Sequence, residues 1–276
     1  MTPLTIEPLA ATVGARVVGA DPDHLLHDEE VAQWCLEALE AHGALVFRDL
    51  QLDDATQVAF SNRLGPVEVF GAGEHPEIFR VTLDPAKNPS ADYLRGTFDW
   101  HIDGMTDDIP IKATLLSARA VADSGGDTEF ASTYAAYEQL SDEEQARLAR
   151  VRVVHSFEAS QLLVNPDPAP EELAMWRQRP PKEHPLVWHH RSGRRSLVLG
   201  ATTSRVVGMD ADESRTLLDD LLARSTAPQH VYRHRWSVGD LVIWDNRGVL
   251  HRALPYSRDS ARDMHRTTIS GDEPVG

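Results

Sequence analysis

The chain has 276 residues, and its 27 basic and 43 acidic side chains give a formal net charge of −16, which argues against a surface for nucleic acid or for an acidic membrane. Its single cysteine, Cys35, excludes an intramolecular disulfide and a cysteine-rich zinc site. A hydrophobic content of 41% and a charged content of 25% are typical of a globular protein that can bury a sizeable core.

The N-terminal residues 1–26 alternate in polarity and carry Gly14 and Gly19, a pattern typical of short strands joined by turns. They lack a basic region followed by an apolar stretch, and no apolar run in the chain reaches the ~20 residues that a membrane helix needs. We therefore expect no signal peptide, no membrane contact and a cytoplasmic protein.

Helices and strands alternate over the next forty or so residues. Apolar side chains recur at helical spacing from His27 to about Ala41, and Gly43 ends this helix before a buried strand in residues 44–50 (ALVFRDL). A second helix is predicted over residues 52–64. No glycine-rich phosphate loop follows a strand, which argues against a nucleotide-binding doubly wound fold.

Two segments in the middle of the chain are irregular. Residues 71–97 are rich in Gly, Pro, Asn and Asp, and residues 159–185 carry many prolines. Long loops in compact domains often cover or form binding sites, so we expect both segments to act as lids. Between them, residues 111–121 (IKATLLSARAV) and 128–130 read as strands, and residues 132–150 as a helix in which Ser141 and Glu144 form a capping box.

The last third of the chain contains many short strands. They are expected at residues 184–190, 195–200, 230–236, 239–246 and 263–270, with one helix at residues 212–224. Many short strands with few helices predict a mainly β protein with peripheral helices, a sandwich or barrel, in a single domain over residues 1–276.

His101 and Asp103 stand two residues apart in FDWHIDGM (98–105), so on extended backbone both side chains leave from the same face. Such a pair is either solvated or binds a metal. His251, on a later strand, could complete a set of two imidazoles and one carboxylate. That set leaves three positions of an octahedral ion open, as non-haem iron(II) oxygenases require. Arg262 or Arg266 could then bind the far carboxylate of a bidentate co-substrate.

Four segments together resemble one known family. They are WHIDG (100–104), SGGDTEF (124–130), VYRHRWSVGDLVIWDNRGVLHR (231–252) and RDMHRTTISGD (262–272). The chain resembles, over nearly its whole length, the Fe(II)- and 2-oxoglutarate-dependent dioxygenases of the taurine dioxygenase and 2,4-dichlorophenoxyacetate dioxygenase family. The resemblance implies a double-stranded β-helix, or jelly roll, that assembles as a homo-oligomer.

The resemblance also implies a role for individual residues. It assigns His101, Asp103 and His251 to Fe(II), with no catalytic residue beyond these ligands, and Thr128 and Arg262 to the distal carboxylate of 2-oxoglutarate. With O2, a member of this family would hydroxylate its substrate and release succinate and CO2.

Four further positions concern the substrate. Arg266 falls where the family places a second arginine near an anionic group of the substrate, and Gly104 falls where relatives approach it. Phe70 and Thr97 stand where the taurine enzyme has a histidine and an asparagine that contact its substrate, which argues against taurine. We expect a small organic anion, hydroxylated with or without cleavage of a C–O, C–N or C–S bond.

Two alternatives stay open on the sequence alone. A jelly-roll protein could keep the metal site and only bind 2-oxoglutarate or another ligand without catalysis. A metal-dependent hydrolase could use zinc at the same ligands and would need no oxygen.

Overall fold

The computed structural model describes residues 3–276, so residues 1–2 of the predicted N-terminal strands lie outside the described part. A seven-stranded sheet runs through the molecule in the order β1-β2-β3-β13-β5-β15-β4. In chain order its strands are β1 (Thr5–Pro8), β2 (Ala15–Val18), β3 (Ala44–Phe47), β4 (Phe79–Val81), β5 (Ala113–Ala120), β13 (Leu241–Asp245) and β15 (Asp263–Ile269). Neighbours pair antiparallel except β2 and β3, which are parallel.

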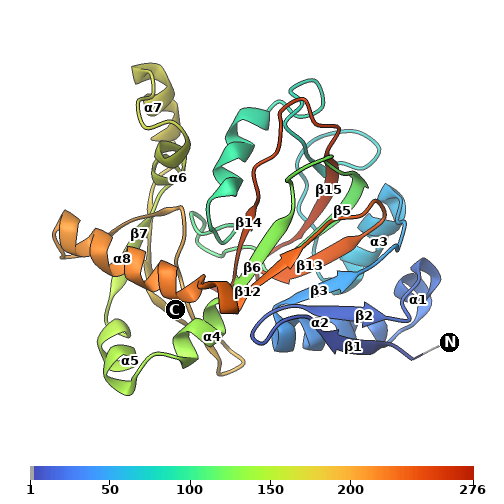
Figure 1. The fold of residues 1–276 in the computed structure, drawn as a ribbon, viewed down its shortest axis with the longest axis horizontal. Coiled ribbons are helices and arrows are strands. Elements are labelled where there is room, and N and C mark those ends of the chain that lie inside the picture. Colours follow the sequence, from blue (N-terminus) through green and yellow to red (C-terminus); the bar gives the residue numbers. More distant parts are fainter. Residues whose placement is uncertain (1–2) are drawn as a thin grey trace.

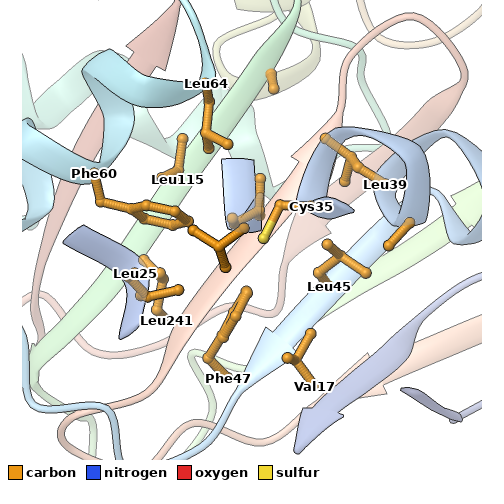
Figure 2. Close-up of a cluster of buried hydrophobic side chains, with 14 of the residues drawn as sticks. Val17, Leu25, Cys35, Leu39, Leu45, Phe47, Phe60, Leu64, Leu115 and Leu241 are labelled. Atoms are coloured by element: carbon orange, nitrogen blue, oxygen red, sulfur yellow. The ribbon is translucent and has the colours of Figure 1, made fainter. Parts of the chain in front are cut away.

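Helices cover one face of this main sheet. They are α1 (Pro22–His27), α2 (Val31–His42) and α3 (Asp54–Leu64), and Figure 1 shows them on the side of the sheet where the chain begins. Their apolar side chains, including the thiol of Cys35, pack on one side of the strands (Figure 2). In β13 the alternate residues Leu241 and Ile243 point to these helices, as the period of a strand requires. Cys35 is therefore a buried core residue.

A second, three-stranded sheet faces the other side of the main sheet. It contains β12 (Val231–His234), β6 (Thr128–Ser132) and β14 (Val249–Ala253) in the order β12-β6-β14. Val242 and Trp244 of β13 join Phe130 of β6 and Val249 of β14 in one buried cluster. The two sheets thus share a core, and the candidate site lies at its end.

The rest of the chain forms a smaller layer beside the second sheet. Its helices are α4 (Thr133–Glu138), α5 (Asp142–Leu148), α6 (Phe157–Val164), α7 (Pro170–Trp176) and α8 (Ala211–Ser225), with short 3-10 helices η1 (Ala91–Phe98) and η2 (Pro228–His230). Its strands are β7 (Arg152–His155), β8 (Lys182–Pro185), β9 (Val187–His189), β10 (Arg195–Leu197) and β11 (Thr203–Val206). No helix within residues 3–276 combines the length and the hydrophobicity that crossing a membrane demands.

The prediction of a mainly β chain is only partly confirmed, because helices are more numerous than the pattern indicated. The helix expected from His27 begins at Val31, and a separate α1 precedes it, with Asp21 capping its first turn. The segment 159–185, expected to be irregular, contains most of α6 together with α7 and β8. The segment 71–97 contains β4 and most of η1.

The long helix expected over residues 132–150 is two helices. Ser132 caps α4, and Ser141 caps α5 with the predicted capping box to Glu144. Each serine offers the backbone a turn that begins a new helix, so the first helix ends before the second cap. The buried strands β3, β5 and β13 and the helices α3 and α8 lie close to where the sequence placed them.

Several histidines are buried in a neutral form, which makes the fold sensitive to acid. Burial and the nearby His184 lower the pKa of His155 to about 3, and burial lowers that of His190 to about 4. Between pH 6.5 and these values the unfolded chain takes up protons that the folded chain excludes, so the free energy of unfolding should fall as the pH falls.

We expect His155→Leu to make the free energy of unfolding less dependent on pH, by about 1.4 kcal/mol per pH unit below pH 6, because one proton fewer is taken up on unfolding. The measurement is urea unfolding of both proteins between pH 5 and 7.5, followed by far-UV circular dichroism. Equal slopes for the two proteins would show that His155 is not kept neutral by the fold.

Candidate functional site

The two histidines and the aspartate singled out in the sequence lie together. A pair of backbone hydrogen bonds links His101 to His251, from each N–H to the other carbonyl oxygen, at 3.0 and 2.9 Å. The Oδ1 atom of Asp103 lies 3.6 Å from Nε2 of His101, and its Oδ2 atom lies 3.5 Å from Nε2 of His251. One ligand atom from each of the three residues lies within 4.8 Å of the others. Atoms bound roughly 2.1 Å from one ion are about 3 to 3.5 Å apart, so this spacing suits a single metal ion.

The protonation of His101 also suits a cation. Its Nδ1 lies 2.8 Å from the carbonyl oxygen of Asp99, which can only accept, so Nδ1 carries the proton. Burial, with a smaller contribution from His251, lowers the pKa of His101 to about 4, so the ring is neutral near pH 7. Its Nε2 lone pair therefore faces the carboxylate of Asp103, and a cation between the two would remove this repulsion.

Asp103 is ionised in this setting. Burial opposes its charge, but the side chain of His251 and the more distant guanidinium of Arg266 hold the pKa of Asp103 below its ordinary value. The site thus presents a carboxylate and two imidazoles to one point, which is the chemistry that a divalent transition metal needs.

These three residues line a cavity between the two sheets. It contains about 460 Å³ of space free of atoms, part of it open to solvent. The strand register explains which side chains share the cavity. In the second sheet Thr128 pairs with Ala253 and Phe130 pairs with His251. Because alternate residues of a strand point to the same face, Thr128 and His251 lie on one face of this sheet. The lining also includes Val81, Leu94, Thr97, Leu116, Trp244, Arg262 and Arg266.

Arg262 and Thr128 both line this cavity. The Arg262 guanidinium is buried, donates to the carbonyl oxygen of Gly126 at 3.2 Å and to the hydroxyl of Tyr256 at 3.3 Å, and lies 4.7 Å from the centre of that ring. It forms no ion pair within residues 3–276. Burial lowers its pKa from a very high ordinary value, and a guanidinium remains charged. The Thr128 hydroxyl accepts from the indole N–H of Trp236 at 3.0 Å, so its own proton is free for an acceptor in the cavity.

Arg266 lies at another wall, held by aromatic rings. Its guanidinium carbon is 4.7 Å from the ring centre of Phe79 and 5.5 Å from that of Phe70, and its buried Nε has no hydrogen-bond partner in the described chain. In β15 it pairs with Leu116 of β5, which also lines the cavity. A half-buried guanidinium whose Nε lacks a partner among the described residues is suited to bind an anion.

The remaining substrate candidates differ in their placement. Thr97 lines the cavity, with its hydroxyl donating to the carbonyl oxygen of Leu94 at 2.6 Å. Phe70 is 39% exposed and touches the site only through Phe79 and Arg266. Gly104 is not part of the lining; its φ of +81° makes the turn after Asp103, and a side chain there would meet the backbone nitrogen of Ile111 at 2.8 Å.

Sequence reasoning missed several residues that complete the site. Tyr256 lies against Arg262, and Thr114 donates to Asp103 at 3.3 Å. Leu94, Val81 and Ala253 supply apolar lining. The pairing of β5 with β13 and of β6 with β14 would have indicated which residues point inward, but that pairing is not visible in one sequence.

The two irregular segments contribute unequally to the cavity. Residues 71–97 supply three lining side chains, whereas residues 159–185 supply none. The second segment lies behind the first: α6 contacts η1, and Tyr93 of η1 lies 5.8 Å from Phe157 between ring centres. The wall formed by η1 therefore rests on α6.

Comparison with known proteins gives a consistent result. The family model described as "Taurine catabolism dioxygenase TauD, TfdA family" matches residues 5–268. The alpha-ketoglutarate-dependent 2,4-dichlorophenoxyacetate dioxygenase of Cupriavidus pinatubonensis is 36% identical, with 97% of this chain and 98% of the relative covered. The alpha-ketoglutarate-dependent sulfate ester dioxygenase of Pseudomonas putida is 31% identical, over 99% of this chain and 91% of the relative. The crystal structure of AAD-2 in complex with Mn(II) and N-oxalylglycine aligns with a TM-score of 0.84 and 33% identity, covering 99% of this chain and all of that one.

The turn before Thr128, which lies against Arg262, contains two glycines in the left-handed region, Gly125 (φ +70°) and Gly126 (φ +73°). A Cβ on Gly125 would lie 2.1 Å from the carbonyl oxygen of Pro255. We expect Gly125→Ala to cost at least about 2 kcal/mol more unfolding free energy than Gly193→Ala. Gly193 is a matched control, because it also has a positive φ (+87°) and has no atom within 4 Å of its Cβ position. Equal losses in urea unfolding would show that the turn can move away from Pro255.

Proposed function

This chain belongs to the TauD/TfdA family of 2-oxoglutarate-dependent dioxygenases, and we propose that it uses His101, Asp103 and His251 to bind Fe(II) and hydroxylates a small organic anion. The observation that carries the proposal is that two imidazoles and one ionised carboxylate converge in one largely apolar cavity. Two imidazoles and a carboxylate on one face leave three positions of the ion free.

Hydrogen bonds from the backbone hold the two histidines in place. Backbone hydrogen bonds between His101 and His251 fix the two rings side by side, 4.2 Å apart between centres. The Asp99 carbonyl holds the His101 ring in the tautomer whose Nε2 can bind a metal. With O2 and 2-oxoglutarate, Fe(II) supplies the oxidation that hydroxylates a C–H bond while 2-oxoglutarate becomes succinate and CO2.

Arg262 and Thr128 bind the distal carboxylate of 2-oxoglutarate in this proposal. Arg262 is a buried cation without an ion-pair partner in the described chain, and a bidentate guanidinium–carboxylate pair suits it. The free proton of the Thr128 hydroxyl adds a second donor on the same side. The ring of Tyr256 lies 4.7 Å from the guanidinium and stabilises it without neutralising its charge.

The substrate combines an anionic group with an apolar body. Arg266 supplies the charge that an anion needs, and Val81, Leu94 and Leu116 supply an apolar wall. The relatives named for phenoxyacetate, phenoxypropionate and sulfate ester chemistry act on molecules of this kind. If the hydroxylated carbon bears an ether or ester oxygen, the resulting hemiacetal loses an alcohol or acid and leaves a carbonyl group, which breaks the C–O bond.

We also infer that the two facing sheets form the double-stranded β-helix of a single catalytic domain, with residues 71–97 as the lid and residues 159–185 as its support. A cytoplasmic homo-oligomer agrees with the family resemblance.

The first test is an anaerobic titration of the apo-protein with Fe(II) and then 2-oxoglutarate, read as a visible charge-transfer band. We expect the band in the wild type, its loss in Asp103→Ala, and about a 10- to 100-fold weaker affinity for 2-oxoglutarate in Arg262→Ala. Arg152→Ala is the matched control, because that arginine is exposed and paired with Glu183. Absence of a band in wild type with bound iron would reject the co-substrate assignment. Succinate release that depends on a substrate separates an enzyme from a ligand sensor, and oxygen dependence separates it from a zinc hydrolase.

The second test concerns Arg266 and uses a panel of aryloxyalkanoates and alkyl sulfates, with succinate release as the assay. For any substrate found, Arg266→Ala should raise the Michaelis constant of that substrate by about 10- to 100-fold, because a charged hydrogen bond is lost. The Michaelis constant of the co-substrate should change less than about 3-fold, because Arg262 still binds it. Equal effects on the two constants would mean that Arg266 does not bind the substrate.

A further inference from the structure

A chain of hydrogen bonds runs from the core to Asp103. The indole N–H of Trp244 donates to Oδ1 of Asn246 at 3.0 Å, and Nδ2 of Asn246 lies 2.8 Å from the hydroxyl of Thr114. The Thr114 hydroxyl lies 3.3 Å from Oδ2 of Asp103. Thr114 and Asn246 are fully buried and Trp244 is nearly so, so water does not compete for these bonds.

The indole N–H of Trp244 determines which group donates in each of these hydrogen bonds. An indole nitrogen can only donate, so the oxygen of the Asn246 amide must face Trp244 and its NH2 group must face Thr114. The Thr114 oxygen accepts from that amide, which leaves its single proton for Asp103. The relay of Trp244, Asn246 and Thr114 therefore ends in a hydroxyl that donates to Oδ2 of Asp103.

The strands fix the relay in place. Trp244 of β13 and Thr114 of β5 are register partners, and Thr114 pairs in turn with Thr268 of β15, so the three lie in one row across the main sheet. Asn246 directly follows β13, and its N–H donates to the carbonyl oxygen of Lys112 at 3.0 Å. A relay attached to two neighbouring strands of the sheet cannot rotate as a side chain on a loop would.

We infer that Thr114 and Asn246 are positioning residues that set the rotation of the Asp103 carboxylate. By holding Oδ2, the relay leaves Oδ1 as the free oxygen, so that Asp103 offers a metal one ligand atom. A carboxylate bound through both oxygens would occupy one of the three positions that 2-oxoglutarate and O2 need. The inference rests on the proposed role of Asp103 as a metal ligand.

The test compares binding of Co(II) to the apo-protein, followed by the visible absorption of the ion, in the wild type and in matched variants. Thr114→Val keeps the shape and removes the hydroxyl; we expect about ten-fold weaker Co(II) binding and shifted absorption bands. Thr114→Ser returns the hydroxyl and should restore both. Thr268→Val is the control, because it makes the same change in the same row at a buried hydroxyl that has no partner among residues 3–276, and it should match the wild type.

Asn246→Leu extends the test to a residue that does not contact Asp103. It should weaken Co(II) binding by itself and add little to Thr114→Val in the double variant, because both changes interrupt one relay. If Thr114→Val does not fold, Asn246→Leu tests the relay in its place.

The outcomes separate this inference from the proposed function. Wild-type binding and absorption in Thr114→Val, or the same loss in Thr268→Val, would overturn the relay and leave the metal site intact. Failure of the wild type to bind Co(II), or unchanged binding in Asp103→Ala, would overturn both.

Discussion

Two backbone hydrogen bonds, between His101 and His251, are the contact on which the rest of the site depends. They join segments that are 150 positions apart in the chain and belong to different parts of the fold. Because they use main-chain atoms, the imidazole nitrogens remain available for a ligand. Ile102, between His101 and Asp103, packs in a core cluster on the opposite side with Leu250, so the apolar core holds the polar side chains toward the cavity.

The charge of the site is opposite to that of the whole chain. The protein carries a net charge of −16, yet the buried Arg262 and the half-buried Arg266 line the cavity without ion pairs in the described residues. Both guanidinium groups rest on aromatic rings, of Tyr256 and of Phe79, each 4.7 Å away. A carboxylate partner would compete with an incoming anion, whereas the face of a ring stabilises a cation and leaves its donors free. Aromatic support therefore keeps these arginines ready to bind anions.

Much of this arrangement could be predicted from the sequence, and the part that could not has physical reasons. Strong periodicity and caps located β5, α3 and α8, and the spacing of His101 and Asp103 implied one face. Proline obscured α1 and α7, because each helix has a proline in its first turn, where it is tolerated but resembles a loop signal. Thr114 carries no signal, because one threonine in an apolar strand is ordinary until the strands around it are paired.

The support of η1 by α6 has a consequence for how such a protein could acquire new substrates. Gly96 of η1 lies against Gln161 of α6, where an added Cβ would be 3.2 Å from the amide nitrogen, so the cavity wall follows the shape of a helix that does not touch the cavity. Changes in α6 and α7 would move Leu94 and Thr97 without altering any lining residue. Evolution, or a laboratory library, can thus reshape specificity from behind the wall, and relatives with identical linings need not share a substrate.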